Sequence, residues 1–296
     1  MVPADGELTG NDYVTLPFID ADGSMDGVSV LHGGLAGLVE WVGGSDRAFL
    51  RPVVRIDGAE VSLDGARWRR LDRWIPTFSV TASPDLAIHG TICAPGGYPA
   101  QRGFMVRLEL ENRGRAPVDV VVAVEIAWRS SRHWVATPRT FPGPNRLGVD
   151  GAGRALLLET DGGRGPAMAI TAAGTPTLRE GPCGAGGAAM PADARIDAAN
   201  GTLLLAAVEQ ALTLVPNRRT VAEFYVGVGR ERDGASTAAH ALRRAGGDAV
   251  LRQARLDLSY TIRAGQDHRW ADLLNRNLIF NRYFAAGRAV DDDRLY

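Results

Sequence analysis

The feature that most constrains the fold is a two-residue alternation of apolar and polar side chains over residues 104–128. Because successive side chains of a β-strand point to opposite faces, this pattern predicts two strands that each bury one face. The turn-forming NRGRAP lies between them, so we expect them to pair as a hairpin packed against another sheet. The buried faces would consist of Phe104, Val106, Leu108 and Leu110 in the first strand, and Val118, Val120, Val122, Val124, Ile126 and Trp128 in the second.

Short apolar runs broken by Gly, Pro, Asn and Asp continue from Val28 to Val228, as is typical of a many-stranded antiparallel protein. This number of strands is larger than an immunoglobulin-like domain contains. The sequence therefore predicts a mainly β protein built on a large two-sheet antiparallel β-sandwich. The runs include VSVLHGG, LAGLVEWVGG, RAFLRPVVRIDG, IPTFSVTASPD, LAIHGTICAPGG, RALLLETDGG, AMAITAAG, GTLLLAAVEQ and TVAEFYVGVG.

The hydrophobic period changes after Gly229. STAAHALRRAGGDAVLRQARLDL predicts two helices separated at Gly246–Gly247, the second N-capped by Asp248, and WADLLNRNLIFNRYF predicts one more helix. We therefore expect the sandwich to be followed by two or three C-terminal α-helices. The predicted domains are a β-sandwich over residues 1–232, a helical linker over 233–266, and a terminal helix within 267–296.

Composition excludes several classes of protein. The 33 basic residues, all of them Arg, nearly cancel 34 acidic residues, so no global field would recruit nucleic acid. The sequence has no run of roughly 18 apolar residues for a membrane span and no basic, apolar leader, so we expect a soluble, cytoplasmic protein. Cys93 and Cys183 lack zinc-site spacing and are expected to be reduced, buried thiols.

Few residues are arranged as a catalytic site would need. Glu109 and Glu111 lie two apart on one strand face, which places their carboxyl groups roughly 6 to 7 Å apart, near the separation used by inverting glycosidases. Charges opposite a buried face more often form a solvated surface, and Arg107 is available to pair with them. The histidines fall at no metal-ligand spacing, so we predict no metal and no cofactor. We assign no catalytic residue to this chain.

The segment EIAWRSSRHWVATPRTFPGPN is the best candidate for contact with a carbohydrate. Trp128 and Trp134 can supply flat apolar faces for sugar rings, while Arg132 and His133 can donate hydrogen bonds. The alternative is that these aromatic residues pack at the edge of the core.

The order of these segments resembles the N-terminal region of glycoside hydrolases and phosphorylases of the glucoamylase and glycogen-debranching type. The resemblance is carried by LHGGLAGLVEWVGG, RWIPTF, RLELENRGRAPVDVVVAVEIAW, FYVGVGRERDGASTAAHALRR and WADLLNRNLIFNRYFAAGRAVDDD. Members of this family join a β-sandwich through a helical linker to an (α/α)6 catalytic barrel. The resemblance thus implies a non-catalytic sandwich that braces a barrel, because the family's acid and base carboxylates lie on barrel loops that nothing in this sequence matches.

The terminal helix looks like the first helix of such a barrel, with apolar residues around much of its circumference. We expect it to contact a barrel-bearing partner chain or a second copy of itself. The interface candidates are Trp270, Ile279, Phe280, Tyr283 and Phe284. The acidic residues 291–293 that follow are expected to form a solvated turn. The alternative is a stand-alone protein of this fold that binds an oligosaccharide or serves in assembly.

Overall fold

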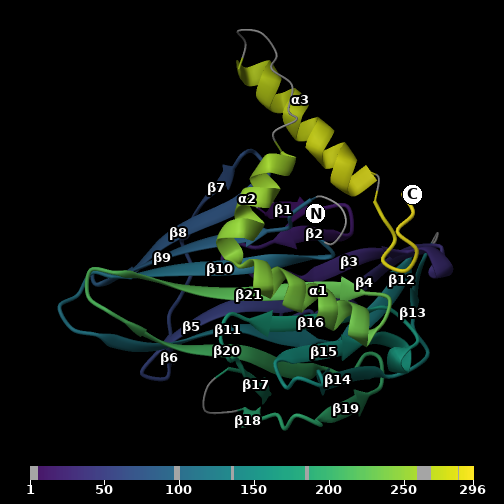
Figure 1. Ribbon diagram of the computed structural model, residues 1–296, viewed down its shortest axis with the longest axis horizontal. Coiled ribbons are helices and arrows are strands. Elements are labelled where there is room, and N and C mark those ends of the chain that lie inside the picture. The colour runs from purple at the N-terminus through teal and green to yellow at the C-terminus, as the bar shows by residue number, and fades with distance from the viewer. Residues whose placement is uncertain (1–5, 97–100, 135–136, 184–186, 259–267, 286) are drawn as a thin grey trace.

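The computed structural model of the protein describes residues 6–96, 101–134, 137–183, 187–258, 268–285 and 287–296. Its strands form an antiparallel sandwich, with helices across one outer side and a further helix that projects away from the strands (Figure 1). The expected mainly β fold, a large sandwich followed by C-terminal helices, is confirmed.

One layer of the sandwich consists of two six-stranded sheets joined end to end. Met25 pairs with both Ile19 and Leu50, which links the two sheets. The N-terminal sheet has the order β1 (Glu7–Gly10), β2 (Val14–Ile19), β3 (Gly27–His32), β4 (Gly37–Val42), β12 (Ser130–Trp134) and β13 (Pro138–Thr140). The central sheet has the order β18 (Ala188–Ala189), β17 (Thr177–Glu180), β20 (Leu204–Leu214), β11 (Val118–Trp128), β5 (Leu50–Ile56) and β6 (Ala59–Glu60).

The other layer is one nine-stranded sheet, here called the helix-covered sheet. Its order is β19 (Arg195–Ala198), β14 (Asn145–Val149), β15 (Ala155–Glu159), β16 (Ala167–Ala172), β21 (Arg219–Gly229), β10 (Gly103–Asn112), β9 (Leu86–Cys93), β8 (Ile75–Ser83) and β7 (Arg67–Leu71). Short helical turns occur at η1 (Gly33–Leu35), η2 (Thr160–Gly163) and η3 (Asn281–Ala285).

The alternating residues of β10 and β11 are buried as expected, but the two strands do not pair with each other. β10 pairs with β9 and β21, whereas β11 pairs with β5 and β20, in the opposite layer. Their apolar faces, including Leu108 and Val124, meet in one core between the layers. The hairpin prediction was wrong because period-two patterning identifies the buried face of a strand and not its hydrogen-bonded neighbour.

Buried Asn112 holds this crossing between layers in place. Its Nδ2 donates to the carbonyls of Ala116 and Leu214, both at 2.9 Å, and its Oδ1 accepts from Gly114 N at 2.9 Å. The amide side chain thereby satisfies backbone groups of the β10–β11 connection and of Leu214, the last residue of β20, after which the chain crosses to β21 in the other layer.

Helices α1 (Arg232–Ala245) and α2 (Gly247–Asp257) cover the outer face of the helix-covered sheet (Figure 1). Ala235 and Ala239 of α1 pack on small residues of β15 and β16. A Cβ atom on Gly227 would lie 2.2 Å from the backbone nitrogen of Ala239, so glycine allows this close approach. The predicted capping by Asp248 is wrong: α2 begins at Gly247 without a side-chain cap, and Asp248 instead accepts from Arg107.

Helix α3 (His268–Phe280) projects away from the sandwich, and the segment after it returns to the strands (Figure 1). Leu31 pairs with Ala289 in an isolated bridge, and Val290 is fully buried in the main core. Part of the predicted linker, residues 259–266, lies outside the described residues. None of the helices in the described ranges is long and apolar enough to cross a membrane.

The acidic turn after α3 is tied to the sandwich and is not simply solvated. Asp291 accepts hydrogen bonds from the backbone nitrogens of Gly33 and Gly34, at 2.7 and 2.9 Å, and lies 3.2 Å from His32 Nδ1. Burial opposes the charge of Asp291, but these donors hold its pKa below the ordinary value. Two segments of the family resemblance, LHGG and DDD, therefore meet in space.

Candidate functional site

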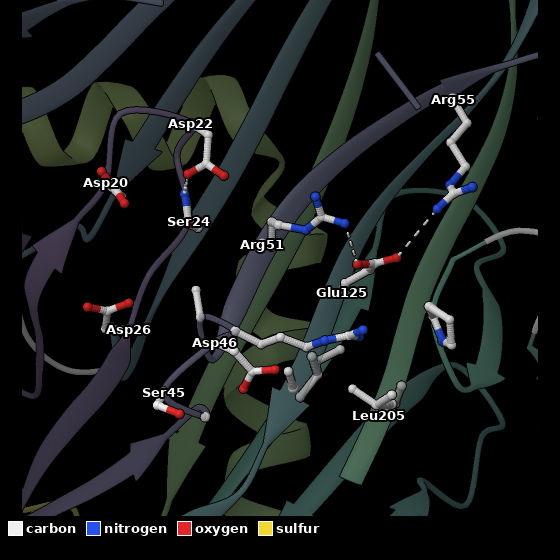
Figure 2. A pocket seen from close by; sticks show the side chains of 17 residues that line it. Asp20, Asp22, Ser24, Asp26, Ser45, Asp46, Arg51, Arg55, Glu125 and Leu205 are labelled. Atoms are coloured by element: carbon white, nitrogen blue, oxygen red, sulfur yellow. Dashed lines mark hydrogen bonds and ion pairs between the residues drawn. The ribbon is translucent and has the colours of Figure 1, made fainter. Parts of the chain in front are cut away.

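A cavity of about 630 Å³ lies on the outer side of the central sheet. The β2–β3 loop and the β4–β5 loop form one side of it, and β5, β11 and β20 form the other (Figure 2). The outward-facing Ala127 and Leu205 contribute to its lining. Small side chains on the strands thus leave room that the two loops enclose.

Glu125 is the central charged group of this cavity. One of its oxygens lies 2.8 Å from Arg51 and the other 4.0 Å from Arg55, as the dashed lines in Figure 2 mark. The backbone nitrogen of Cys183 donates to Glu125 at 2.8 Å. Arg51 also pairs with Glu60, and hydrogen bonds to Glu60 and Glu125 raise the pKa of Arg51 against the opposing effect of burial. The carboxylate of Glu125 is therefore fixed between two cations.

Acidic residues of the two loops face this pair across the cavity (Figure 2). They are Asp20, Asp22 and Asp26 of the β2–β3 loop, with Asp46 of the β4–β5 loop. Burial, followed by repulsion from Asp20 and Asp22, raises the pKa of Asp26. Among the described residues, no group of three or more His, Cys, Asp or Glu side chains is placed to hold a metal ion.

This arrangement suits a small ligand rich in hydroxyl groups. Carboxylates accept hydrogen bonds from hydroxyls, while Arg47, Arg51 and Arg55 can donate to them. No aromatic side chain is among the lining residues, so the cavity offers no stacking surface for a sugar ring. The sequence analysis missed this site, although Glu125 interrupts the apolar run VDVVVAVEIAW and was a detectable signal.

The predicted carbohydrate-contacting residues lie elsewhere, at the boundary between β11 and β12. Trp128 is fully buried in the core, so neither face of its ring is accessible. Arg132 is exposed, and Trp134 is 37% exposed with its indole nitrogen donating to Glu40. His133 is half-buried, with its Nε2 3.1 Å from the carbonyl of Leu35.

A second cavity, of about 360 Å³, lies beside Glu40 on the outer face of the N-terminal sheet. It is lined by strand residues and by the C-terminal segment, and it offers aromatic side chains and carboxylates together. Glu40 lines it and also bonds Trp134, so the exposed indole adjoins its edge. Its aromatic lining residues are Tyr13, Tyr283, Phe284 and Tyr296.

The predicted interface residues of the terminal helix divide into two groups. Ile279 and Tyr283 are buried against Trp74 and neighbouring residues of the sandwich and helices. Trp270 and Phe280 are exposed, and Phe284 is half-buried, with its ring stacked on Phe280 at a centroid distance of 5.0 Å.

Glu109 and Glu111 each lie close to arginine. Glu109 is 3.2 Å from Arg107 and 3.9 Å from Arg219, while Glu111 is 3.1 Å from Arg113. These contacts agree with the expectation of a paired sheet surface. Cys93 and Cys183 are free and buried, as expected, and burial raises the pKa of each thiol to about 12.

No protein-family model and no curated protein matches the sequence. Among solved structures, a bacterial glucoamylase complexed with acarbose aligns over 95% of this chain and 42% of its own, with 11% identity and a TM-score of 0.49. A putative kojibiose phosphorylase from the human microbiome aligns over 92% and 35%, with 9% identity and a TM-score of 0.45. A putative aldose 1-epimerase from Escherichia coli K12 aligns over 76% and 99%, with 10% identity and a TM-score of 0.44.

Proposed function

We propose that this chain is the non-catalytic β-sandwich portion of a carbohydrate-active enzyme and braces a helical catalytic domain through α3. The observation that carries the proposal is the surface of α3. Its buried stripe, formed by Ala271, Asn275 and Ile279, faces the rest of the chain. Large apolar side chains remain exposed on both sides of that stripe: Trp270, Leu273, Leu274, Leu278 and Phe280.

The spacing of the exposed residues favours a helix as the occupant. Trp270, Leu274 and Leu278 follow one another at intervals of four, and such a ridge fits the groove of a neighbouring helix. Exposed apolar patches of this kind normally mark an interface. The resemblance to sandwich-and-barrel enzymes supports a barrel helix as that neighbour.

The base of α3 is held firmly enough to present this ridge. Tyr283 packs on Trp74 with ring centroids 5.6 Å apart, and Asp291 accepts from the Gly33–Gly34 backbone. Near the other end, Arg73 lies 2.5 Å from Asp272. These contacts join both ends of the helical segment to the sandwich.

The first test is to read the coding sequence adjacent to this chain and to produce any helical domain found there together with it. Co-elution of the two at the mass of a complex is expected. Leu278→Asp should separate them, whereas Val215→Asp, at an exposed apolar position between β20 and β21, should not. If no helical domain is encoded nearby and the chain is monomeric, the proposal fails. If the chain instead forms a homodimer that Leu278→Asp dissociates, the partner of α3 is a second copy of this chain and not a barrel.

The second candidate is a stand-alone oligosaccharide-binding protein. It is favoured by the exposed Trp134 beside Glu40 and the aromatic-lined cavity of about 360 Å³. Aromatic faces next to carboxylates suit the apolar and hydroxyl-bearing sides of sugar rings. A glycan array followed by calorimetry should then find a ligand whose affinity falls at least about tenfold in Trp134→Ala. Trp270→Ala, which removes another exposed indole, is the control; an array without binding rejects this candidate.

A further inference from the structure

A third hollow, of about 540 Å³, lies where the C-terminal half of α1 meets the β14–β15 turn. Four of its five lining residues are basic: Arg154, His240, Arg243 and Arg244, with Ala152. None of the lining residues is a carboxylate, in contrast to the cavity around Glu125. Although the whole chain is nearly neutral, the lining of this hollow is therefore positively charged.

A buried carboxylate positions two of these basic groups. Asp150 Oδ2 lies 2.7 Å from His240 Nε2, and Asp150 Oδ1 accepts from the backbone nitrogens of Arg154 and Ala155 at 2.8 and 3.0 Å. Ser236 donates to the same carboxylate at 3.2 Å. These bonds fix the turn that carries Arg154 against the helix that carries His240.

The three arginines are not neutralised by the contacts of the described residues. Arg243 donates to the carbonyl of Gly174, a neutral acceptor that orients the guanidinium and leaves its charge in place. No carboxylate of the described chain lies within ion-pair distance of Arg154, Arg243 or Arg244. Arg51, Arg70, Arg146 and Arg179, in contrast, each pair with a carboxylate.

Arginines in the last turn of a helix also interact favourably with the helix dipole. That effect accounts for Arg243 and Arg244, but not for Arg154, which comes from a β-turn on the other side of the hollow. Guanidinium groups converging from two elements form the arrangement that binds phosphate oxygens, because each group can donate two parallel hydrogen bonds.

We propose that this hollow binds a phosphate group, held between Arg154 of the β14–β15 turn and Arg243 and Arg244 of α1. The site is separate from α3 and from the cavity around Glu125, so it stands independently of the proposed bracing function. The phosphate can belong to free inorganic phosphate or to a phosphorylated sugar.

The test is calorimetric titration of the intact chain at one fixed ionic strength, because exposed charges are screened by salt. The ligands are inorganic phosphate, glucose 1-phosphate, glucuronate and glucose. We expect inorganic phosphate and glucose 1-phosphate to bind and glucose not to bind. Equal affinities for inorganic phosphate and glucose 1-phosphate would mean that the phosphate group alone is recognised. Tighter binding of glucose 1-phosphate would mean that the site recognises a sugar phosphate.

Arg154→Gln and Arg244→Gln should each weaken phosphate binding by about tenfold or more, since each removes a charge-assisted donor. Arg154→Lys, which keeps the charge but loses the paired donors, should fall between wild type and Arg154→Gln. Arg219→Gln, at an exposed arginine of β21, is the control. Circular dichroism confirms that each variant is folded. Absence of phosphate binding, tighter binding of glucuronate, or unchanged affinity in both glutamine variants overturns the proposal.

Discussion

Replacing Tyr283 by alanine should release α3 from the sandwich without unfolding the strands. The Tyr283 ring is 3% exposed and packs on Trp74 at 5.6 Å, while Phe284 meets Trp74 edge-on at 5.9 Å. Truncation of a buried aromatic residue to alanine costs about 3–5 kcal/mol. Because α3 buries only one stripe of its surface, a loss of about 4 kcal/mol is a large part of what holds it in place.

Hydrogen exchange followed by mass spectrometry measures this directly. In Tyr283→Ala, peptides covering residues 268–285 should lose protection, while β11 and β20 keep theirs because the buried clusters that contain their residues do not include Tyr283. Tyr296→Ala is the control, since Tyr296 is 55% exposed and its hydroxyl donates to Asp292 Oδ2 at 2.9 Å. Unchanged protection of α3, or equal loss throughout the strands, would refute this reasoning.

Three further outcomes are expected. At pH 8 a thiol reagent should label neither Cys93 nor Cys183 in the native protein and both in urea, because burial raises each thiol pKa to about 12; rapid native labelling would contradict this. Gly227→Ala should lower the free energy of unfolding by about 1–3 kcal/mol through its clash with α1, whereas Gly151→Ala, with open space around it, should not. Bonds from His240 and two backbone nitrogens lower the pKa of Asp150 despite burial, so its stabilising contribution is present above the unfolded pKa near 4 and lost as pH falls further. Urea unfolding should therefore show a smaller loss between pH 6 and pH 3 in Asp150→Asn than in wild type.

The class of fold was predictable from local pattern, but strand partners were not. Alternation in residues 104–128 correctly identified the side chains that face the core between the layers, but not that Met105 and Ala123 are buried on the outer faces. The same alternation arises whether two strands pair within a sheet or face each other across a core, and here they face each other. What directs the crossing is Asn112, a single polar residue whose partners lie up to 102 positions away.

The candidate sites depended even more on long-range contacts. Trp128 and Trp134 looked equivalent in the sequence, yet the first fills the core and the second lies beside Glu40. Glu125 accepts hydrogen bonds from Arg51, 74 positions earlier, and from the backbone nitrogen of Cys183. Asp291 resembled a solvated residue because its donors, Gly33 and Gly34, lie at the other end of the chain.

The most direct test of the bracing function is the dissociation constant between this chain and a separately produced helical domain encoded beside it, measured by calorimetry. We predict saturable binding with a negative heat-capacity change, as burial of apolar surface requires. Exchanging both Leu274 and Leu278 for Asp should weaken it at least about a hundredfold, since each buried leucine contributes about 1.5–3 kcal/mol. Absence of binding, or equal affinity in the double variant, would contradict the claim that α3 is the docking surface.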